Sequence, residues 1–124
     1  QILETDVETR TLGDSGEEEI VTSKDRVFLL SDEQARRYFE KKSDRTAGVS
    51  QAIREKLEED ADEESGLKPG VSELSDTAFW WLRTPGDRGD CVQCVGAEGS
   101  LVTAGYLAVQ ANFGVRPALW VDLD

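Results

Sequence analysis

The sequence predicts a single domain that combines helices with β-strands. Its length of 124 residues allows one layered hydrophobic core and no second folding unit. The first half contains two segments with helix start signals, at residues 31–42 and 50–57, and the second half contains short apolar runs separated by glycines. Because such runs are typical of a β-meander, we expect the helices to be followed by a small antiparallel sheet.

The clearest local signal is the helix that follows the apolar run at residues 27–30. Ser31 and Gln34 form an S-x-x-Q capping box, in which each side chain bonds the backbone N–H of the other residue. The acidic pair at 32–33 lies in the first turn and the lysine pair at 41–42 in the last, as the helix dipole favours. The face expected to pack on the core carries Ala35, Tyr38 and Phe39.

A second helix is expected to begin after Ser50 and then to give way to an acidic loop. Its thin apolar stripe consists of Ala52, Ile53 and Leu57. Residues 58–64 are almost all carboxylates and glycine and proline follow them, so residues 58–70 are predicted to form a loop. A hard-metal site is the alternative, but the segment lacks the D-x-D-x-D-G spacing of a calcium loop. We therefore expect a solvated, self-repelling loop and no metal site.

An aromatic strand is predicted at residues 79–82, with a turn at Pro85-Gly86. Adjacent residues of a strand point to opposite faces, so Trp80 and Trp81 are expected to serve different layers. One would fill the core and the other would support a surface or groove. Stacking of a tryptophan on a sugar is the alternative, but core packing is favoured.

The C-terminal third is predicted to be a series of short strands. These strands are residues 91–95, 101–103, 107–109 and 115–123, with a turn at Glu98-Gly99 and breaks at Gly105 and Gly114. Pro117 cannot donate a backbone hydrogen bond and marks the last strand as bulged or partly at an edge. Arg116 lies between apolar neighbours and needs an acidic or carbonyl partner if it is buried.

Composition excludes several function classes. The net charge of −12 argues against nucleic acid and anionic membrane surfaces as partners, because both require a basic surface. The absence of histidine removes the commonest general base and every zinc site that contains histidine. No apolar run approaches the roughly 20 residues of a membrane span, so no membrane insertion is expected. The chain begins with Gln1 rather than methionine, which indicates a processed product or a piece of a longer chain.

The two cysteines, Cys91 and Cys94, form a lone C-x-x-C motif. In one extended strand their Cα atoms would lie about 10 Å apart. That distance exceeds the roughly 7 Å limit for a disulfide, and the odd spacing would point the two side chains to opposite faces. A disulfide would therefore need a turn between them.

Three blocks of sequence, VFLLSDEQARRYF, FWWLRTPG and GVRPALWVDL, resemble in this order a bacterial domain family of uncharacterised function. The resemblance covers residues 1–124, and the family is similar to the C-type-lectin-like fold of formylglycine-generating-enzyme-type domains. It implies an α+β domain with a twisted antiparallel sheet, two helices and long loops. It also implies that an N-terminal segment of the family domain is missing here, which a separate fragment or a larger parent chain would supply.

Related domains of this lectin-like fold are variable proteins of diversity-generating retroelements, in which asparagine codons of a C-terminal cassette are altered at their adenines. By this resemblance, residues 87–113 are the variable ligand-binding region, displayed on a rigid frame. Most residues from 91 to 113 are of types that such codons can become, whereas Gln93 and Gln110 are not. The candidate binding residues are Arg88, Asp90, Cys91, Gln93, Cys94, Gly96, Ser100, Val102, Thr103, Tyr106, Leu107, Gln110, Asn112 and Phe113.

The resemblance thus implies a noncatalytic receptor or adhesion domain with a protein or glycan ligand and no cofactor, carried on a bacterial cell surface or a phage particle. An ordinary meander without a ligand is one alternative. A second is a formylglycine-generating-enzyme-like or redox or metal enzyme that uses Cys91 and Cys94, although a lone C-x-x-C supplies at most two ligands of a zinc site. A third, compatible with ligand binding, is a structural tip of a larger surface or phage protein.

Overall fold

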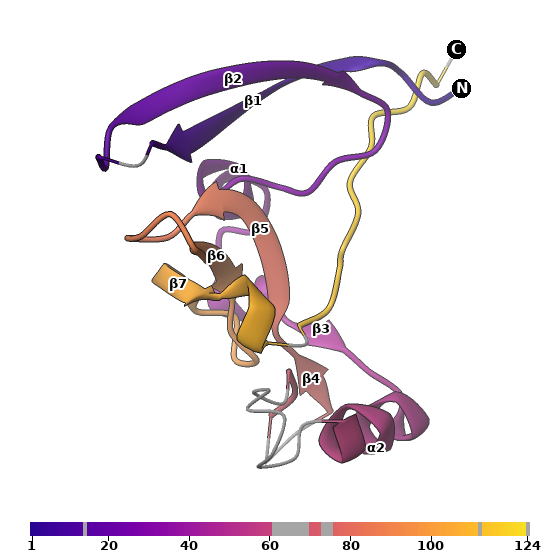
Figure 1. Cartoon of the computed structure of the whole chain (residues 1–124). Helices are drawn as coiled ribbons and strands as arrows, with labels where there is room; N and C mark the ends of the chain where they lie inside the picture. The colour runs from indigo at the N-terminus through magenta and orange to yellow at the C-terminus, as the bar shows by residue number, and fades with distance from the viewer. Residues whose placement is uncertain (14, 61–69, 73–75, 112, 124) are drawn as a thin grey trace.

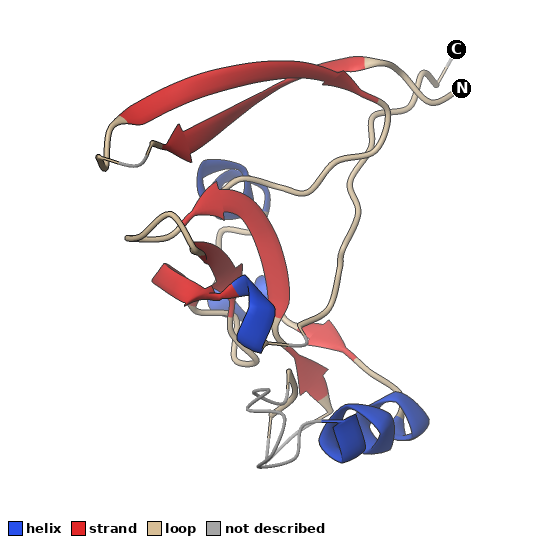
Figure 2. Cartoon of the chain, in the orientation of Figure 1, coloured by secondary structure: helices blue, strands red, loops and turns tan. Residues whose placement is uncertain are grey.

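The structure is a computed structural model of the chain and describes residues 1–13, 15–60, 70–72, 76–111 and 113–123. It confirms an α+β domain, with short helices and small sheets whose strand pairs are antiparallel. Figure 1 shows a long curved hairpin over one side of the molecule, a central sheet, and a smaller unit with a helix at the far end. Loops make up much of the chain between these elements (Figure 2).

The N-terminal hairpin pairs β1 (Thr5–Leu12) with β2 (Glu18–Asp25) along the full length of both strands. The turn between them includes Gly16, whose φ of 82° lies in the left-handed region that favours glycine. Among the described residues of the hairpin, Val7 is the one that is buried. The sequence reasoning made no prediction for this segment.

The first helix, α1 (Asp32–Tyr38), has the predicted capping box at Ser31 and Gln34. It ends earlier than predicted, because Phe39 leaves the helical conformation and the carbonyl of Phe39 accepts a hydrogen bond from Arg45 instead, at 2.8 Å. The lysines at 41–42 therefore lie beyond the helix, next to or within the 3-10 helix η1 (Lys42–Arg45). Of the predicted core face, Ala35 and Phe39 pack inward, whereas Tyr38 is 42% exposed.

The smaller unit contains β3 (Ala47–Gly48), β4 (Thr77–Ala78) and α2 (Gln51–Asp60). Ser50 caps α2 as predicted, because its hydroxyl accepts a hydrogen bond from the Ile53 N–H at 3.3 Å. The thin apolar stripe of this helix is exposed at two of its positions, Ala52 and Ile53. The predicted acidic loop begins too early, because residues 58–60 belong to α2, and residues 61–69 lie outside the described residues.

The central sheet consists of β5 (Trp80–Pro85), β6 (Cys91–Val95) and β7 (Leu101–Leu107), in that order. Trp80 is 1% exposed and Trp81 is half-buried on the other face of β5, as strand alternation predicts. Gly99 has a φ of 90° in the turn before β7, which agrees with the predicted turn. Gly105 does not end a strand: it lies inside β7, where its φ of 80° accompanies a register shift against β6.

The C-terminal segment 115–123 is extended but is not the predicted strand. It makes isolated bridges, in which Ala118 pairs with Phe28 and Val121 pairs with Ile2. A continuous ladder is interrupted because Pro117 has no N–H to donate. Figure 1 shows this segment returning past the hairpin, so that the two chain ends lie together.

The hydrophobic core lies between α1 and the central sheet. Its buried members are Leu30, Ala35, Trp80, Leu82 and Val95. Trp80 is placed by a hydrogen bond from its indole N–H to the carbonyl of Arg45, at 2.9 Å. None of the described helices is both long enough and apolar enough to span a membrane.

Candidate functional site

The predicted binding segment, residues 87–113, divides by burial into a framework and a display surface. Arg88, Asp90 and Thr103 are exposed, and Ser100, Val102, Tyr106 and Leu107 are half-buried. The buried members are Cys91, Gln93, Cys94, Gly96 and Phe113. Asn112 lies outside the described residues, and only the backbone of Gln110 is described. A ligand can therefore reach the exposed and half-buried residues directly. It can reach the buried residues only if the sheet opens.

The buried members are explained by the position of β6, which is the middle strand of the sheet. Neighbouring strands cover both of its edges, and four of its five residues are buried. The Gln93 side chain donates a hydrogen bond from Nε2 to the carbonyl of Pro85 at 3.2 Å, while its Oε1 is buried without a partner among the described residues. These contacts give β6 a structural role in the frame.

The exposed part of the segment centres on β7, which has β6 on one side and no described strand on the other. Its sequence, LVTAGYL, contains no charged residue. Thr103 and Ala104 are exposed within β7, and Val109 in the following 3-10 helix η2 (Ala108–Gln110) is 84% exposed. Open sheet edges in soluble proteins are usually protected by charge or proline, so an uncharged edge can pair with another strand.

A cluster of aromatic rings supports β7 on the face of β5 opposite to the core. The Phe113 ring lies 4.8 Å from that of Phe79 and 4.6 Å from that of Trp81, between ring centroids. The Tyr106 ring meets the Phe113 ring edge to face at 5.2 Å. Tyr106 is thus held in place by packing, as a preformed ligand contact should be. Trp81 has the supporting role that strand alternation predicted for one of the two tryptophans.

The loop between β5 and β6 is tied to β7. The Asp87 N–H donates a hydrogen bond to the carbonyl of Ala104 at 3.0 Å. Arg88 approaches the carboxylate of Asp90 at 3.4 Å and the sulfur of Cys91 at 3.6 Å. The hydrogen bond to Cys91, followed by the charge of Asp90, raises the pKa of Arg88. The exposed residues at 87–90 therefore continue the surface of β7 and carry its charged groups.

The two cysteines lie in β6 as buried thiols that are not joined in a disulfide. Cys94 is fully buried and Cys91 is 6% exposed. The sequence argument against a disulfide within one extended strand agrees with this arrangement. Among the described residues, no group of three histidine, cysteine, aspartate or glutamate side chains is placed to hold a metal ion.

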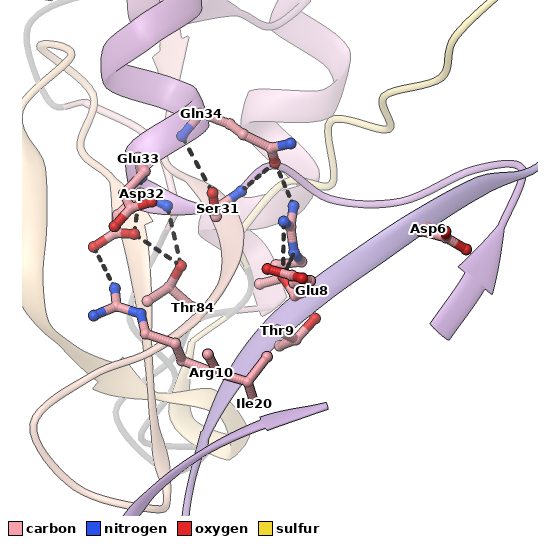
Figure 3. Close-up of a pocket in the computed structure, with 11 residues that line it drawn as sticks. Asp6, Glu8, Thr9, Arg10, Ile20, Ser31, Asp32, Glu33, Gln34 and Thr84 are labelled. Carbon is pink, nitrogen blue, oxygen red and sulfur yellow. Dashed lines mark hydrogen bonds and ion pairs between the residues drawn. The ribbon is translucent and has the colours of Figure 1, made fainter. Parts of the chain in front are cut away.

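A polar cavity of about 390 Å³ lies between the hairpin and the start of α1 (Figure 3). Asp32 is its buried centre: its carboxylate accepts hydrogen bonds from Arg10 at 2.8 Å and from the hydroxyl of Thr84 at 3.2 Å. Arg83 donates hydrogen bonds to the carbonyl of Glu8, at 3.1 and 3.0 Å, and to the side chain of Gln34. These contacts join the hairpin to the domain.

Electrostatics in this cavity favour the charged form of Asp32. Burial alone would raise the pKa of Asp32, but hydrogen bonds from Arg10, the Glu33 N–H and Thr84, with the charge of Arg10, hold it below its ordinary value. Burial lowers the pKa of Arg83, and the nearby charge of Asp32 opposes that shift. Because these groups already satisfy one another, the cavity is a structural junction between hairpin and domain.

The sequence reasoning missed the hairpin that forms one wall of this junction. The available signals were the G-D-S-G turn at residues 13–16 and the β-branched residues on either side of it. Burial alternates only weakly along both strands, since β2 is exposed almost throughout. The pattern of a half-buried strand is therefore faint there.

Comparison with known proteins gives one match. A family model described as "Domain of unknown function (DUF6273)" matches residues 1–123. No curated protein and no solved structure matches the chain.

Proposed function

This chain belongs to the DUF6273 family, and we propose that it is a noncatalytic ligand-binding domain that displays a diversified surface on a C-type-lectin-like scaffold. The proposed ligand surface comprises the loop 87–90, β7 and η2. One observation carries the proposal: an uncharged sheet edge with exposed residues is supported from behind by a buried strand and packed aromatic rings. The α+β architecture with a small antiparallel sheet is the coarser frame within which the lectin-like scaffold is proposed.

Burial supports a division between scaffold and display. A surface that changes its residues must leave the free energy of folding intact, so variable positions belong on exposed loops and edges of a rigid frame. Thr103, Ala104 and Val109 are exposed and fill no part of the core, whereas Cys94 and Val95 are fully buried. The first group can vary at little cost and the second cannot.

The preferred ligand is a protein segment in extended conformation. The free edge of β7 offers backbone groups for strand addition, which is a common mode of peptide recognition. The overall charge of −12 favours a segment that carries basic residues. Burial of both thiols argues against the alternative of an enzyme that uses Cys91 and Cys94, because a reactive thiol needs access.

The proposal can be tested by panning a random peptide library on the immobilised domain. We expect enrichment of peptides whose sequences favour a β-strand conformation. These peptides should bind the wild-type domain saturably. Ala104→Glu places a charge on the proposed edge and should weaken their binding by about tenfold or more, since a desolvated, unpaired carboxylate opposes association. Ala52→Glu makes the same change on exposed α2 and should leave binding unaltered.

Two results would count against this function. Enriched peptides that bind Ala104→Glu as well as wild type would place the ligand elsewhere. No saturable peptide binding, together with binding of glycans that Ala104→Glu weakens, would retain the surface and replace the protein ligand.

A further inference from the structure

Arg116 stands in an environment unlike that of the other arginines. Its guanidinium carbon lies 4.8 Å from the centre of the Phe39 ring and 5.0 Å from that of the Trp80 ring. Its Nη1 is buried, and no described residue accepts a hydrogen bond from it. Cation–π contact with two rings holds the group in place but leaves that donor unused.

The other arginines differ from Arg116 in the groups that they contact. Ion pairs to described carboxylates are made by Arg10, Arg26, Arg36, Arg54 and Arg88. Arg45 and Arg83 donate to backbone carbonyls. Arg37 is exposed and lies against the Tyr38 ring. Arg116 has no such partner among the described residues, in a chain with 26 acidic side chains. Arg116 as a whole is half-buried, and its buried Nη1 donor would be satisfied by an anionic acceptor.

A cavity of about 410 Å³ adjoins Arg116. The apolar side chains that line it include Ala47, Val49, Ala78, Phe79 and Val115, and polar atoms form about as much of its wall as apolar atoms do. Thr46 is the polar side chain that lines it besides Arg116. A cavity that offers apolar side chains and one charged side chain suits a small molecule that has an apolar body and one charged end.

We propose that this cavity binds a small carboxylic acid with an apolar body, and that Arg116 binds its carboxylate. The planar guanidinium matches a carboxylate with two parallel hydrogen bonds. The apolar side chains of the lining favour a ligand with an apolar body over inorganic phosphate, which has no apolar surface to bury. The site uses no residue of the segment 87–113 and does not depend on the ligand surface proposed above.

Titration of the wild-type domain with benzoate, benzamide and inorganic phosphate tests the proposal without any mutation. The readout is the NMR shift of the Arg116 Nε–H and of the Trp80 indole N–H, because both residues line the cavity. Benzoate should bind saturably. Benzamide and phosphate should bind at least about tenfold more weakly, because benzamide lacks the carboxylate and phosphate lacks the apolar body. Equal affinity for benzoate and benzamide, tighter binding of phosphate, or no saturable binding of benzoate would overturn the proposal.

Two variants test whether the carboxylate of benzoate binds Arg116. Arg116→Met keeps an apolar side chain of similar length against the two rings and should weaken benzoate binding about tenfold or more. Arg26→Gln removes the same charge from an exposed arginine and should leave benzoate binding unchanged. Undiminished binding to Arg116→Met would overturn the assignment. If that variant does not fold, the benzoate and benzamide comparison in wild type still decides the question.

Discussion

Gly99 occupies a position where any side chain would be both strained and crowded. Its φ is 90°, and a Cβ atom would lie 1.9 Å from the carbonyl oxygen of Lys42. Gly99→Ala is therefore expected to lower the free energy of unfolding by about 3 kcal/mol, from backbone strain and overpacking together. Gly16 has a similar φ of 82° but open space around it, so Gly16→Ala should cost only about 1 kcal/mol. Urea unfolding of both variants measures the difference, and equal costs would show that the close approach of Lys42 is absent.

Asp32 should stabilise the fold in a pH-dependent manner. Its pKa is lowered below the ordinary value of 3.8, so its contribution is complete above that value and is lost as the pH falls through the lower folded-state pKa. Asp32→Asn is expected to cost about 2 kcal/mol at pH 7, because it weakens a buried, charge-assisted network. The difference from wild type should shrink below about pH 4.

A matched control for that experiment is Asp6→Asn. Asp6 makes an exposed ion pair with Lys24 at 3.8 Å, and its loss should cost less than about 0.5 kcal/mol. Denaturant unfolding at several pH values measures both variants. A cost for Asp32→Asn that is as small as for Asp6→Asn, or that does not change with pH, would contradict the role given to the junction.

At the level of elements, β6 should keep its two thiols unreactive in the native state. Both are buried in the middle strand of the sheet, so a thiol reagent can reach them only through local or global unfolding. We expect labelling by a chromogenic disulfide reagent to be slow without denaturant and to reach two thiols per chain in urea. Fast labelling of either cysteine in the native protein would revive the enzyme alternative.

Elements with local signals could be predicted from the sequence. The start of α1 depends on Ser31 and Gln34, which are three residues apart, and the opposite faces of Trp80 and Trp81 follow from strand alternation alone. The early end of α1 could not be predicted, because it involves Arg45 reaching back to Phe39. Local patterns do not reveal contacts made by a side chain from another element.

Some features of the candidate site follow from local sequence, and others depend on contacts between distant residues. The bounds of β6 were predicted correctly from its sequence, but its burial depends on having a neighbour on each side, which is a property of strand order. The bridges of Ala118 to Phe28 and of Val121 to Ile2 are likewise long-range. For this reason the segment 115–123 was predicted as one strand when it is a set of isolated contacts.

At the scale of the whole molecule, the chain combines a small core with a separate aromatic cluster. The core joins α1 to the inner face of the sheet, and the rings of Phe79, Trp81 and Phe113 support the other face beneath β7. The charge of −12 keeps copies of the chain apart and lessens the risk that uncharged sheet edges pair with one another. Among the described strands, β7 leaves one edge of this sheet unpaired, and this is the edge proposed above to bind a ligand.

The most direct measurement for the proposed display surface is sequencing of this gene across many isolates of one source population. The account predicts that substitutions within 87–113 concentrate at exposed positions such as Thr103, Ala104 and Ala108. The buried positions Cys94 and Val95 should stay constant together with the aromatic strand β5. Substitutions spread evenly over the chain, or as frequent in β6 as in β7, would contradict a diversified surface on a fixed scaffold.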